Sequence, residues 1–347
     1  MADHLVEPKD GDGPLTKKDF ASDQLVRWCP GCGDYAILSA VQKAMPELGY
    51  AREDIVFVSG IGCAARFPYY MNTFGFHTIH GRGPAFATGI KLSNPDLCVW
   101  EVQGDGDTLA IGGNHFIHAI RRNIDINIMV FNNEIYGLTK GQYSPTSRKG
   151  TKSGSTPMGS LERPFSLGEL ALGAQGTFYA RTLDTNPKLM TQIVTESCKH
   201  KGTSLIEILQ NCLIYNDKIH FDITDKANAD ETQLHLVHGE PMIFGKEKNK
   251  GIILKGLELK VAIIGEKGVS EDDILVHDAH EESNTLHLML IKMKGPEFPT
   301  AMGIIRAVAT STYNDEIAEQ IEEAKKAATI NTMDELLASG NTWHVEE

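Results

Sequence analysis

The chain has 347 residues, 41 % of them hydrophobic, and its 46 acidic and 33 basic side chains give a formal net charge of −13. This length is enough to bury a large core, either as two domains or as one large α/β unit. The acidic balance argues against a nucleic-acid backbone or an anionic membrane surface as the main partner.

The chain has neither an expected membrane span nor a recognisable signal peptide. Apolar runs are short, as in INIMVF at 126–131, and none reaches the roughly 20 residues that a bilayer requires. The first residues, MADHLVEPKDGDGP, are acidic where a signal peptide would be basic and then apolar. We therefore expect a cytoplasmic protein, in which cysteines serve more often as ligands or buried thiols than as disulfides.

The expected elements begin with a loose, polar N-terminal arm over 1–22 and a helix over 34–45. Apolar strands follow at 54–60, 97–103, 126–131 and 203–212, with a helix predicted over 108–123. Short apolar strands that alternate with helices are typical of a mostly parallel sheet covered by helices on both faces. We predict this α/β domain over 23–220.

The sequence texture changes after residue 220, where we predict a smaller α+β C-terminal extension over 221–347. Apolar and polar residues alternate over 251–269, which is typical of a β-hairpin, and residues 314–330 have the pattern of a charged amphipathic helix. Before this extension, the Ser-, Thr- and Gly-rich segment 139–160 predicts a long exposed loop. Loops of this length inside a domain are usually functional or mobile.

Oxygen-bearing side chains follow two of the predicted strands. GDGD at 104–107 places Asp105 at the end of one strand, and NN at 132–133 places Asn133 at the end of another. In an open parallel sheet ligands collect at these carboxyl ends, and two such oxygen donors suit a hard divalent cation that shares its ligands with phosphates. Each motif alone is more often a turn or a helix cap, but the pair at this spacing favours a metal–phosphate site. The pair resembles the diphosphate-and-magnesium signature of thiamine-diphosphate enzymes, in which Asp105, Asn133 and the carbonyl of Ile135 would hold Mg²⁺.

A rival interpretation begins at Gly60-x-Gly62-x-x-Ala65, which fits a loose dinucleotide-binding fingerprint after a strand. That site needs an acidic residue about 20 positions later, and no Asp or Glu occurs from 55 to 95. The same loop instead presents Cys63 at a strand end.

Four cysteines fall near the predicted strand ends: Cys29 and Cys32 in WCPGCGDY, then Cys63 and Cys212. A zinc ribbon would need a second CxxC, and a redox CxxC has no use for the other two cysteines. The spacing fits a [4Fe–4S] cluster best, while zinc and structural or redox thiols stay open. The remaining two, Cys98 and Cys198, we interpret as thiols that bind no metal.

Taken together, the residues resemble the β subunits of 2-oxoacid:ferredoxin oxidoreductases. The blocks WCPGCGDYAI, GIGCAARFPYY, HGRGPAFATGIKLSNPDL, GDGDTLAIGGNHFIHAIRRNIDI, NNEIYGLTKGQYSPTS and ILQNCLIYND match the family in order, from about 22 to 220, and the likeness continues more weakly to about 310. The resemblance implies a thiamine-diphosphate-binding fold for the diphosphate half of the cofactor, and Cys29, Cys32, Cys63 and Cys212 as ligands of a [4Fe–4S] cluster. It also implies that the cofactor contacts Gly62, Cys63, His80, Gly104, Asp105, Gly106, Asp107, Asn133, Ile135, Gly137, Leu138 and Thr139.

The implied reaction is the oxidative decarboxylation of a 2-oxoacid, in which coenzyme A takes the acyl group and electrons pass singly through the cluster to ferredoxin. An α subunit would supply the aminopyrimidine side of the cofactor site and the activating glutamate, in a heterodimer or an α2β2 heterotetramer. The GLTKGQ block resembles the 2-oxoglutarate branch, and Leu138 and Lys140 are the expected substrate-pocket residues, with Lys140 able to pair with the distal carboxylate. Pyruvate or a broader range of 2-oxoacids is the alternative substrate, and an electron-transfer subunit without a catalytic thiamine site is the alternative class.

Other polar residues carry weaker indications. Arg66 and Arg82 lie near glycine turns and could meet substrate or phosphate, or form surface or interface salt bridges. His115 and His118 are three residues apart on a predicted helix, where packing is the commoner role. HDAHEE at 277–282 resembles a metal-binding motif, but we predict a solvated turn there.

Overall fold

The main feature of the computed structural model is an eight-stranded sheet, and the structure describes residues 14–343 and 345. The strand order is β2-β1-β3-β4-β8-β7-β13-β9. The bounds are β1 Ile55–Ser59, β2 Phe74–His77, β3 Cys98–Gly104, β4 Asn127–Asn132, β7 Phe178–Leu183, β8 Ser204–Leu209, β9 Gln233–Leu236 and β13 Thr300–Ala307. The six strands from β2 to β7 are mutually parallel, and β13 joins β7 antiparallel. The predicted α/β class is therefore confirmed. Residues 1–13 of the predicted N-terminal arm lie outside the described residues.

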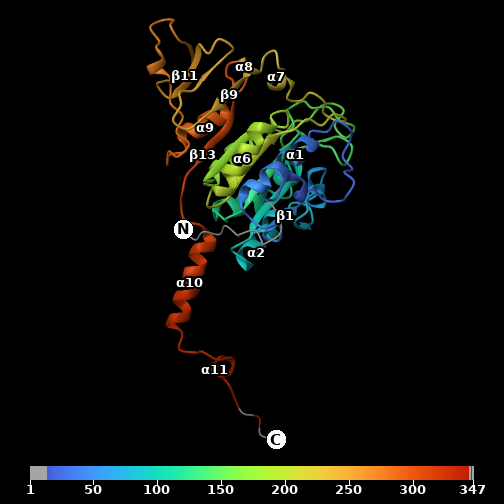
Figure 1. The fold of residues 1–347 in the computed structure, drawn as a ribbon, viewed down its shortest axis with the longest axis vertical. Coiled ribbons are helices and arrows are strands. Elements are labelled where there is room, and N and C mark those ends of the chain that lie inside the picture. Colours follow the sequence, from blue (N-terminus) through green and yellow to red (C-terminus); the bar gives the residue numbers. More distant parts are fainter. Residues whose placement is uncertain (1–13, 344, 346–347) are drawn as a thin grey trace.

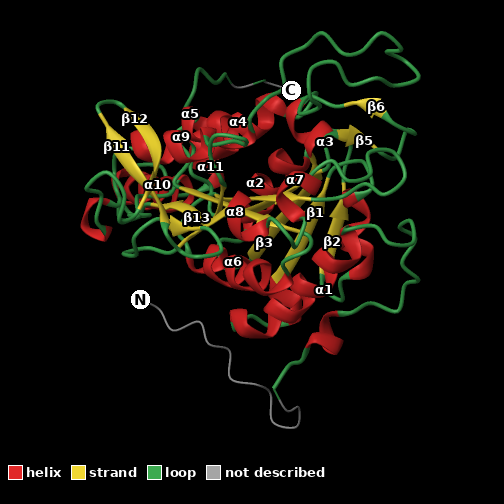
Figure 2. Cartoon of the chain, turned by 90° about the horizontal axis from the view of Figure 1, so that it is seen from above, coloured by secondary structure: helices red, strands yellow, loops and turns green. Residues whose placement is uncertain are grey.

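Two hydrophobic cores lie on opposite faces of this sheet because successive side chains of each strand point to opposite sides. On β4, Ile128 and Val130 enter one core while Met129 and Phe131 enter the other. Figure 2 shows the strands lying between helices. The first core is covered by α2 Gly83–Ser93, α4 Gly113–Arg121, α5 Leu167–Gly173 and α9 Thr285–Lys292. The second is covered by α1 Asp34–Ala44, η2 Met45–Leu48, η4 Ala64–Tyr70 and α6 Pro187–Lys199.

The predicted helix over 108–123 is instead two helices, α3 Asp105–Leu109 and α4. The break lies at Ala110–Gly112, where the backbone of Gly112 approaches that of Gly81 so closely that a Cβ on Gly81 would lie 2.4 Å from Gly112 N. GDGD is therefore not a turn before a helix: Asp105 is itself the first residue of α3.

The predicted loop 139–160 contains the short strand β6 Gln142–Tyr143, which pairs with β5 Ile135–Tyr136. The expectation that this loop is exposed is wrong for part of it, because Ser144, Thr146 and Ser147 are buried. Their hydroxyl groups find partners inside the protein, which removes the usual cost of burying a polar group.

The C-terminal segment is connected more closely to the sheet than expected, because β9 and β13 from the predicted extension 221–347 complete the main sheet. The predicted β-hairpin is confirmed as β11 Lys250–Lys255 and β12 Glu258–Ile263, which β10 Ile243–Phe244 extends to three strands. The predicted charged helix is confirmed as α10 Tyr313–Ala327, and with α11 Met333–Ala338 it extends away from the sheet (Figure 1). The remaining short helices are η1 Lys17–Phe20, η3 Arg52–Asp54, α7 Phe221–Thr224, α8 Ala229–Thr232 and η5 Glu271–Asp273. Among the described residues, no helix combines the length and the apolar character needed to span a membrane.

Candidate functional site

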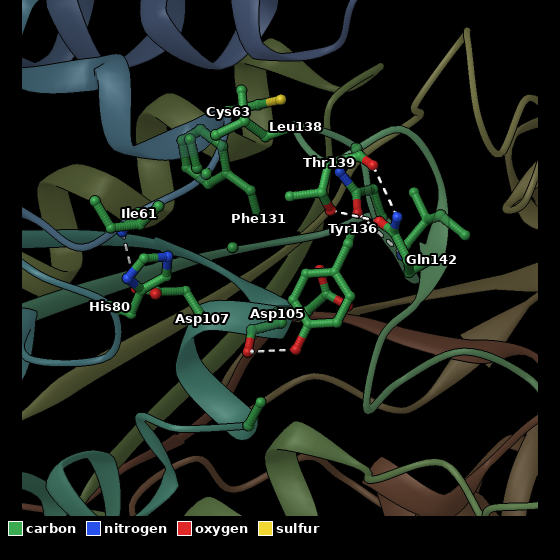
Figure 3. A pocket seen from close by; sticks show the side chains of 18 of the residues that line it. Ile61, Cys63, His80, Asp105, Asp107, Phe131, Tyr136, Leu138, Thr139 and Gln142 are labelled. Carbon is green, nitrogen blue, oxygen red and sulfur yellow. Dashed lines mark hydrogen bonds between the residues drawn. The ribbon is translucent and has the colours of Figure 1, made fainter. Parts of the chain in front are cut away.

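A cavity of about 570 Å³ opens at the carboxyl ends of β1, β3 and β4 (Figure 3). The structure brings all twelve expected cofactor-contacting residues to its wall: Gly62, Cys63, His80, Gly104, Asp105, Gly106, Asp107, Asn133, Ile135, Gly137, Leu138 and Thr139. Sequence reasoning missed a further set that lines the same cavity: Asp34, Ile61, Ala64, Ala110, Ile111, Phe131, Tyr136, Gln142 and Gln210. The parallel strand order explains the convergence, since β1, β3 and β4 are neighbours that all end at one edge of the sheet.

Asp105 is buried directly after β3, and its carboxylate is held by two hydroxyl groups. Ser144 and Thr146 each donate a hydrogen bond of 2.5 Å to Asp105 Oδ2. Burial raises the pKa of this carboxyl group to about 6, and the two hydroxyl donors oppose that shift. These donors lie in the Ser/Thr-rich loop and were not predicted, although the richness of that loop in hydroxyl side chains was the signal available.

Asn133 follows β4, and both ends of its amide are engaged. Its Nδ2 donates to Gln210 Oε1 at 2.8 Å, and its Oδ1 accepts from the backbone N–H of Ile135 at 3.2 Å. Glu134 between them has a positive φ of 54°, which turns the chain sharply after the strand. Asn133 Oδ1 is therefore held in a fixed direction at the cavity wall.

Asp107 holds two loops of the cavity in place. Its carboxylate accepts hydrogen bonds from the backbone N–H groups of Ile61, at 3.2 Å, and Gly81, at 2.9 Å. Gly60 makes this approach possible, since a Cβ there would lie 1.8 Å from Asp107 Oδ2. Asp107 therefore lines the cavity while positioning the Ile61 and Gly81 loops.

The ring of Tyr136 packs against Gly106, where a Cβ would lie 2.2 Å from the ring. The Tyr136 hydroxyl donates to the carbonyl oxygen of Gly106 at 3.2 Å. The middle glycine of GDGD is thus required by a neighbouring aromatic ring as well as by its place beside the cavity.

The four predicted ligand cysteines come from three loops that lie against one another. A Cβ placed on Gly137 would lie 3.5 Å from Cys212 Sγ and 3.7 Å from Cys63 Sγ. The CxxC loop meets the Cys212 loop, since a Cβ on Gly31 would lie 3.0 Å from the Leu213 side chain. Cys32 accepts a hydrogen bond from Gln210 Nε2 at 3.3 Å.

Electrostatics in this region reflect burial. Burial raises the pKa of Cys63 to about 12 and that of Cys32 still further, and the Asp34 carboxylate followed by the neighbouring thiols adds to both shifts. Asp34, two residues after Cys32, is buried, and its pKa is raised by burial to about 7. Within residues 14–343 and 345, no group of three or more His, Cys, Asp or Glu side chains could hold a single metal ion.

The two substrate-pocket candidates differ in position. Leu138 lines the cavity and is half exposed. Lys140 does not line the cavity, and its side chain is exposed. Its backbone has a positive φ of 76° in a tight turn, which is closed by a hydrogen bond from the Lys140 N–H to the carbonyl of Gly137. The structure therefore does not bring Lys140 into the cavity of this chain.

The remaining candidates lie elsewhere or have other partners. Arg82 donates to the carbonyl of His80 beside the cavity, and the charge of Arg66 slightly opposes the burial that raises the pKa of Cys63. Among the described residues neither arginine forms an ion pair. His115 and His118 lie on α4, and neither belongs to a group of three or more His, Cys, Asp or Glu side chains that could hold a metal ion in the described part of the chain.

Cys98 and Cys198 are 3.4 Å apart at their sulfur atoms, and Cys98 also accepts a hydrogen bond from the Trp100 ring. Neither lines the cavity.

The expectation of a solvated turn at 277–282 is wrong for its first residue. His277 is 1 % exposed and bonds to the carbonyl of Ile304 at 2.9 Å, while His280 bonds to the carbonyl of Ala307. Both contacts attach this turn to β13, so the segment serves packing at the sheet edge.

Known proteins resemble this chain in sequence and in fold. Residues 60–208 match the family described as "Thiamine pyrophosphate enzyme, C-terminal TPP binding domain". The chain is 48 % identical, over 96 % of its length and 90 % of the relative, to the 2-oxoglutarate oxidoreductase subunit KorB of Mycobacterium tuberculosis. It is 41 % identical, over 59 % of its length and 80 % of the relative, to the 2-oxoglutarate synthase subunit KorB of Archaeoglobus fulgidus.

Among solved structures, the chain resembles a 2-oxoglutarate:ferredoxin oxidoreductase from Magnetococcus marinus described with 2-oxoglutarate, coenzyme A and succinyl-CoA bound. The TM-score is 0.76 at 28 % sequence identity, and the match covers 97 % of this chain and all of that chain.

Proposed function

We propose that this chain, which belongs to the β subunits of the 2-oxoacid:ferredoxin oxidoreductase family, acts in the CoA-dependent conversion of 2-oxoglutarate to succinyl-CoA and carbon dioxide, or in the reverse reaction. Electrons pass singly to ferredoxin. One observation carries the proposal: Cys63 belongs to the four-cysteine set and also lines the cavity that contains Asp105 and Asn133. A site for decarboxylation and a site for one-electron transfer therefore share a wall.

Residues at the strand ends fit the diphosphate half of thiamine diphosphate with its Mg²⁺. Asp105 supplies a buried carboxylate, Asn133 supplies an amide oxygen in a fixed direction, and the carbonyl of Ile135 is the third ligand we assign. These are oxygen donors, which Mg²⁺ prefers. This donor set combines one acidic side chain with an amide oxygen and a backbone carbonyl.

The cysteines fit a [4Fe–4S] cluster. The sulfur atoms of Cys63 and Cys212 both lie within 4 Å of the position that a Cβ on Gly137 would take. Cys32 accepts a hydrogen bond from Gln210, which lines the same cavity as Cys63. Four cysteine thiolates are the usual ligand set of such a cluster. We assign Cys29, Cys32, Cys63 and Cys212 as its ligands.

When bound, thiamine diphosphate supplies the nucleophilic carbon and electron sink for decarboxylation, and the cluster supplies a one-electron acceptor. The chain's own residues position and enclose these groups. Asp107 fixes the Ile61 and Gly81 loops around the cavity through two backbone hydrogen bonds. Gly62 leaves room for the cofactor, since a Cβ there would meet no atom within 4 Å. Phe131 and Leu138 supply apolar wall that excludes water from the reacting atoms.

An α subunit completes the site in this proposal and supplies the aminopyrimidine side and the activating glutamate. Exposed apolar side chains lie at the cavity: Ile111 lines it, Ile79 directly precedes the lining residue His80, and both are more than half exposed. Apolar side chains exposed beside a cavity support an interaction surface there. We expect a heterodimer or an α2β2 heterotetramer in the cytoplasm.

The substrate assignment rests on the relatives and on the GLTKGQ block. Leu138 contacts the cavity, and Lys140 lies two residues beyond it at the exposed end of the same turn. With the α subunit in place, Lys140 pairs with the distal carboxylate of 2-oxoglutarate in our proposal. Pyruvate, or a broader range of 2-oxoacids, is the alternative substrate. The intact Asp105 and Asn133 pair argues against an electron-transfer subunit without thiamine chemistry.

The test is an anaerobic dye-reduction assay of this chain purified with its co-expressed α subunit. We expect reduction with 2-oxoglutarate that requires coenzyme A and exceeds that with pyruvate or 2-oxobutyrate. Faster reduction with pyruvate would keep the reaction class and remove the role of Lys140. An enzyme that has its cluster absorbance and bound thiamine diphosphate but reduces no dye with any of the three acids would refute the proposed activity.

A further inference from the structure

Gln210 touches both halves of the site. It is 1 % exposed, lies directly after β8 and lines the cavity. Its Oε1 accepts from Asn133 Nδ2 at 2.8 Å, and its Nε2 donates to Cys32 Sγ at 3.3 Å and to the carbonyl of Asn211 at 2.7 Å. No other side-chain amide in the described residues joins the GDGD and NN side of the cavity to the cysteines.

The direction of this amide follows from its neighbours. Asn133 Oδ1 accepts from the N–H of Ile135, so Asn133 presents its Nδ2–H to Gln210. Only an oxygen can receive that donor. Gln210 Oε1 must therefore face Asn133, and Gln210 Nε2 must face the sulfur of Cys32. Reversing the amide would place two N–H groups against each other and leave the thiolate without a donor.

The Gln210 side chain has little freedom to move away. A Cβ on Gly33, which precedes α1, would lie 3.0 Å from Gln210 Cγ. The next residue is also fixed, since the N–H of Asn211 donates to Asp184 Oδ2 at 2.8 Å. Gln210 is therefore a buried, fully hydrogen-bonded amide held by two loops.

We propose that Gln210 is a positioning residue that sets the reduction potential of the cluster and the affinity for Mg²⁺ through one side chain. The inference rests on the proposed function. Toward the cluster, its N–H donates to a ligand sulfur and stabilises the reduced, more negatively charged cluster, because hydrogen bonds to the sulfurs set iron–sulfur potentials. Toward the metal, its oxygen holds Asn133, as outer partners of metal ligands do.

Two substitutions separate these effects. Gln210→Leu keeps the approximate size of the side chain and removes both hydrogen bonds. We expect a more negative cluster potential and a roughly tenfold weaker Mg²⁺ affinity. Gln210→Glu keeps an acceptor for Asn133 but loses the N–H toward sulfur. We expect the more negative potential with Mg²⁺ affinity retained.

Gln233 offers a matched control, since it is a buried glutamine that does not line the cavity, and its amide donates to the carbonyl of Ile223. Gln233→Leu should leave both quantities at the wild-type values.

The experiment is an EPR-monitored redox titration of the complete αβ enzyme, with Mg²⁺ titrated calorimetrically in the presence of thiamine diphosphate. If the wild-type complex shows no cluster signal, the proposed function fails before Gln210 is tested. If the wild type has its cluster and both Gln210 variants keep the wild-type potential, the inference is overturned. If Gln210→Leu does not assemble a cluster, the Glu variant decides. A shift of equal size in Gln233→Leu would also overturn the inference, because the effect would then follow from the loss of any buried glutamine.

Discussion

Thr146→Val tests whether the buried hydroxyl groups hold Asp105 in position. Valine has nearly the same shape as threonine, so the change removes the 2.5 Å hydrogen bond to Asp105 Oδ2 with little disturbance of packing. Hydrogen bonds to charged groups contribute about 1.5–3 kcal/mol, and loss of an outer partner typically weakens a metal site by roughly 10–100-fold. Ser144 still donates to the same oxygen, so we expect a loss near the lower end, about tenfold in Mg²⁺ affinity.

The assay is calorimetric titration of Mg²⁺ into the αβ complex with thiamine diphosphate present. Ser144→Ala should have a comparable effect, and the double variant should lose more than either single variant, because Asp105 Oδ2 then has neither donor. Thr151→Val is the matched control: Thr151 lies in the same loop, and its hydroxyl donates only to the carbonyl of Arg148 among the described residues. Equal Mg²⁺ affinities for wild type, Thr146→Val and the double variant would refute the assignment of Asp105 as the metal ligand that these hydroxyls support.

Three further results are expected. Asp107→Asn leaves a buried backbone N–H facing an amide N–H, which costs about 1–3 kcal/mol. Thermal unfolding of the complex should therefore show a lower midpoint. An unchanged midpoint would contradict the role of Asp107 in holding the Ile61 and Gly81 loops. Burial lowers the pKa of His200 from 6.5 to about 4. As pH falls from 6.5 toward 4 the unfolded chain therefore binds a proton that the folded chain does not, and the free energy of unfolding decreases by up to about 3 kcal/mol. His200→Gln should flatten this part of the curve of unfolding free energy against pH, and a curve of the wild-type slope would exclude His200 as its source. Cys32→Ser should abolish the cluster's visible absorbance and iron content, whereas Cys98→Ser should preserve both; loss of iron in both variants alike would contradict the ligand assignment.

Strand ends were predictable because short apolar runs bounded by Gly, Asp and Asn are a local signal. β1 and β8 fall within the predicted segments, and β3 and β4 each end one residue beyond theirs. β7 was missed because FYARTL contains Arg181, whose charge disguises a buried strand. The register of the sheet places Arg181 opposite Glu207, and the two form a buried ion pair at 2.7 Å. A partner on a strand 26 residues away leaves no mark in the local pattern.

The same limit applies to the site. Asp105, Asn133 and the four cysteines stand out as residue types at distinctive spacing. Ser144, Thr146 and Gln210 do not, because their roles depend on which long-range neighbour they meet. Lys140 shows the converse: a chemically apt residue in a suggestive block lies outside the cavity of this chain. Local spacing identifies atoms that can bind a cofactor, while the hydrogen bonds that orient those atoms come from the folded topology.

The most direct test mixes 2-oxoglutarate and coenzyme A anaerobically with the αβ enzyme, without ferredoxin or dye, and follows the cluster's visible absorbance. Because Cys63 is shared by the cavity and the cysteine set, electrons from the substrate should bleach that absorbance, and the bleaching should require both thiamine diphosphate and Mg²⁺. Release of carbon dioxide from 2-oxoglutarate while the cluster absorbance stays unchanged would contradict a site in which decarboxylation and one-electron transfer share a wall.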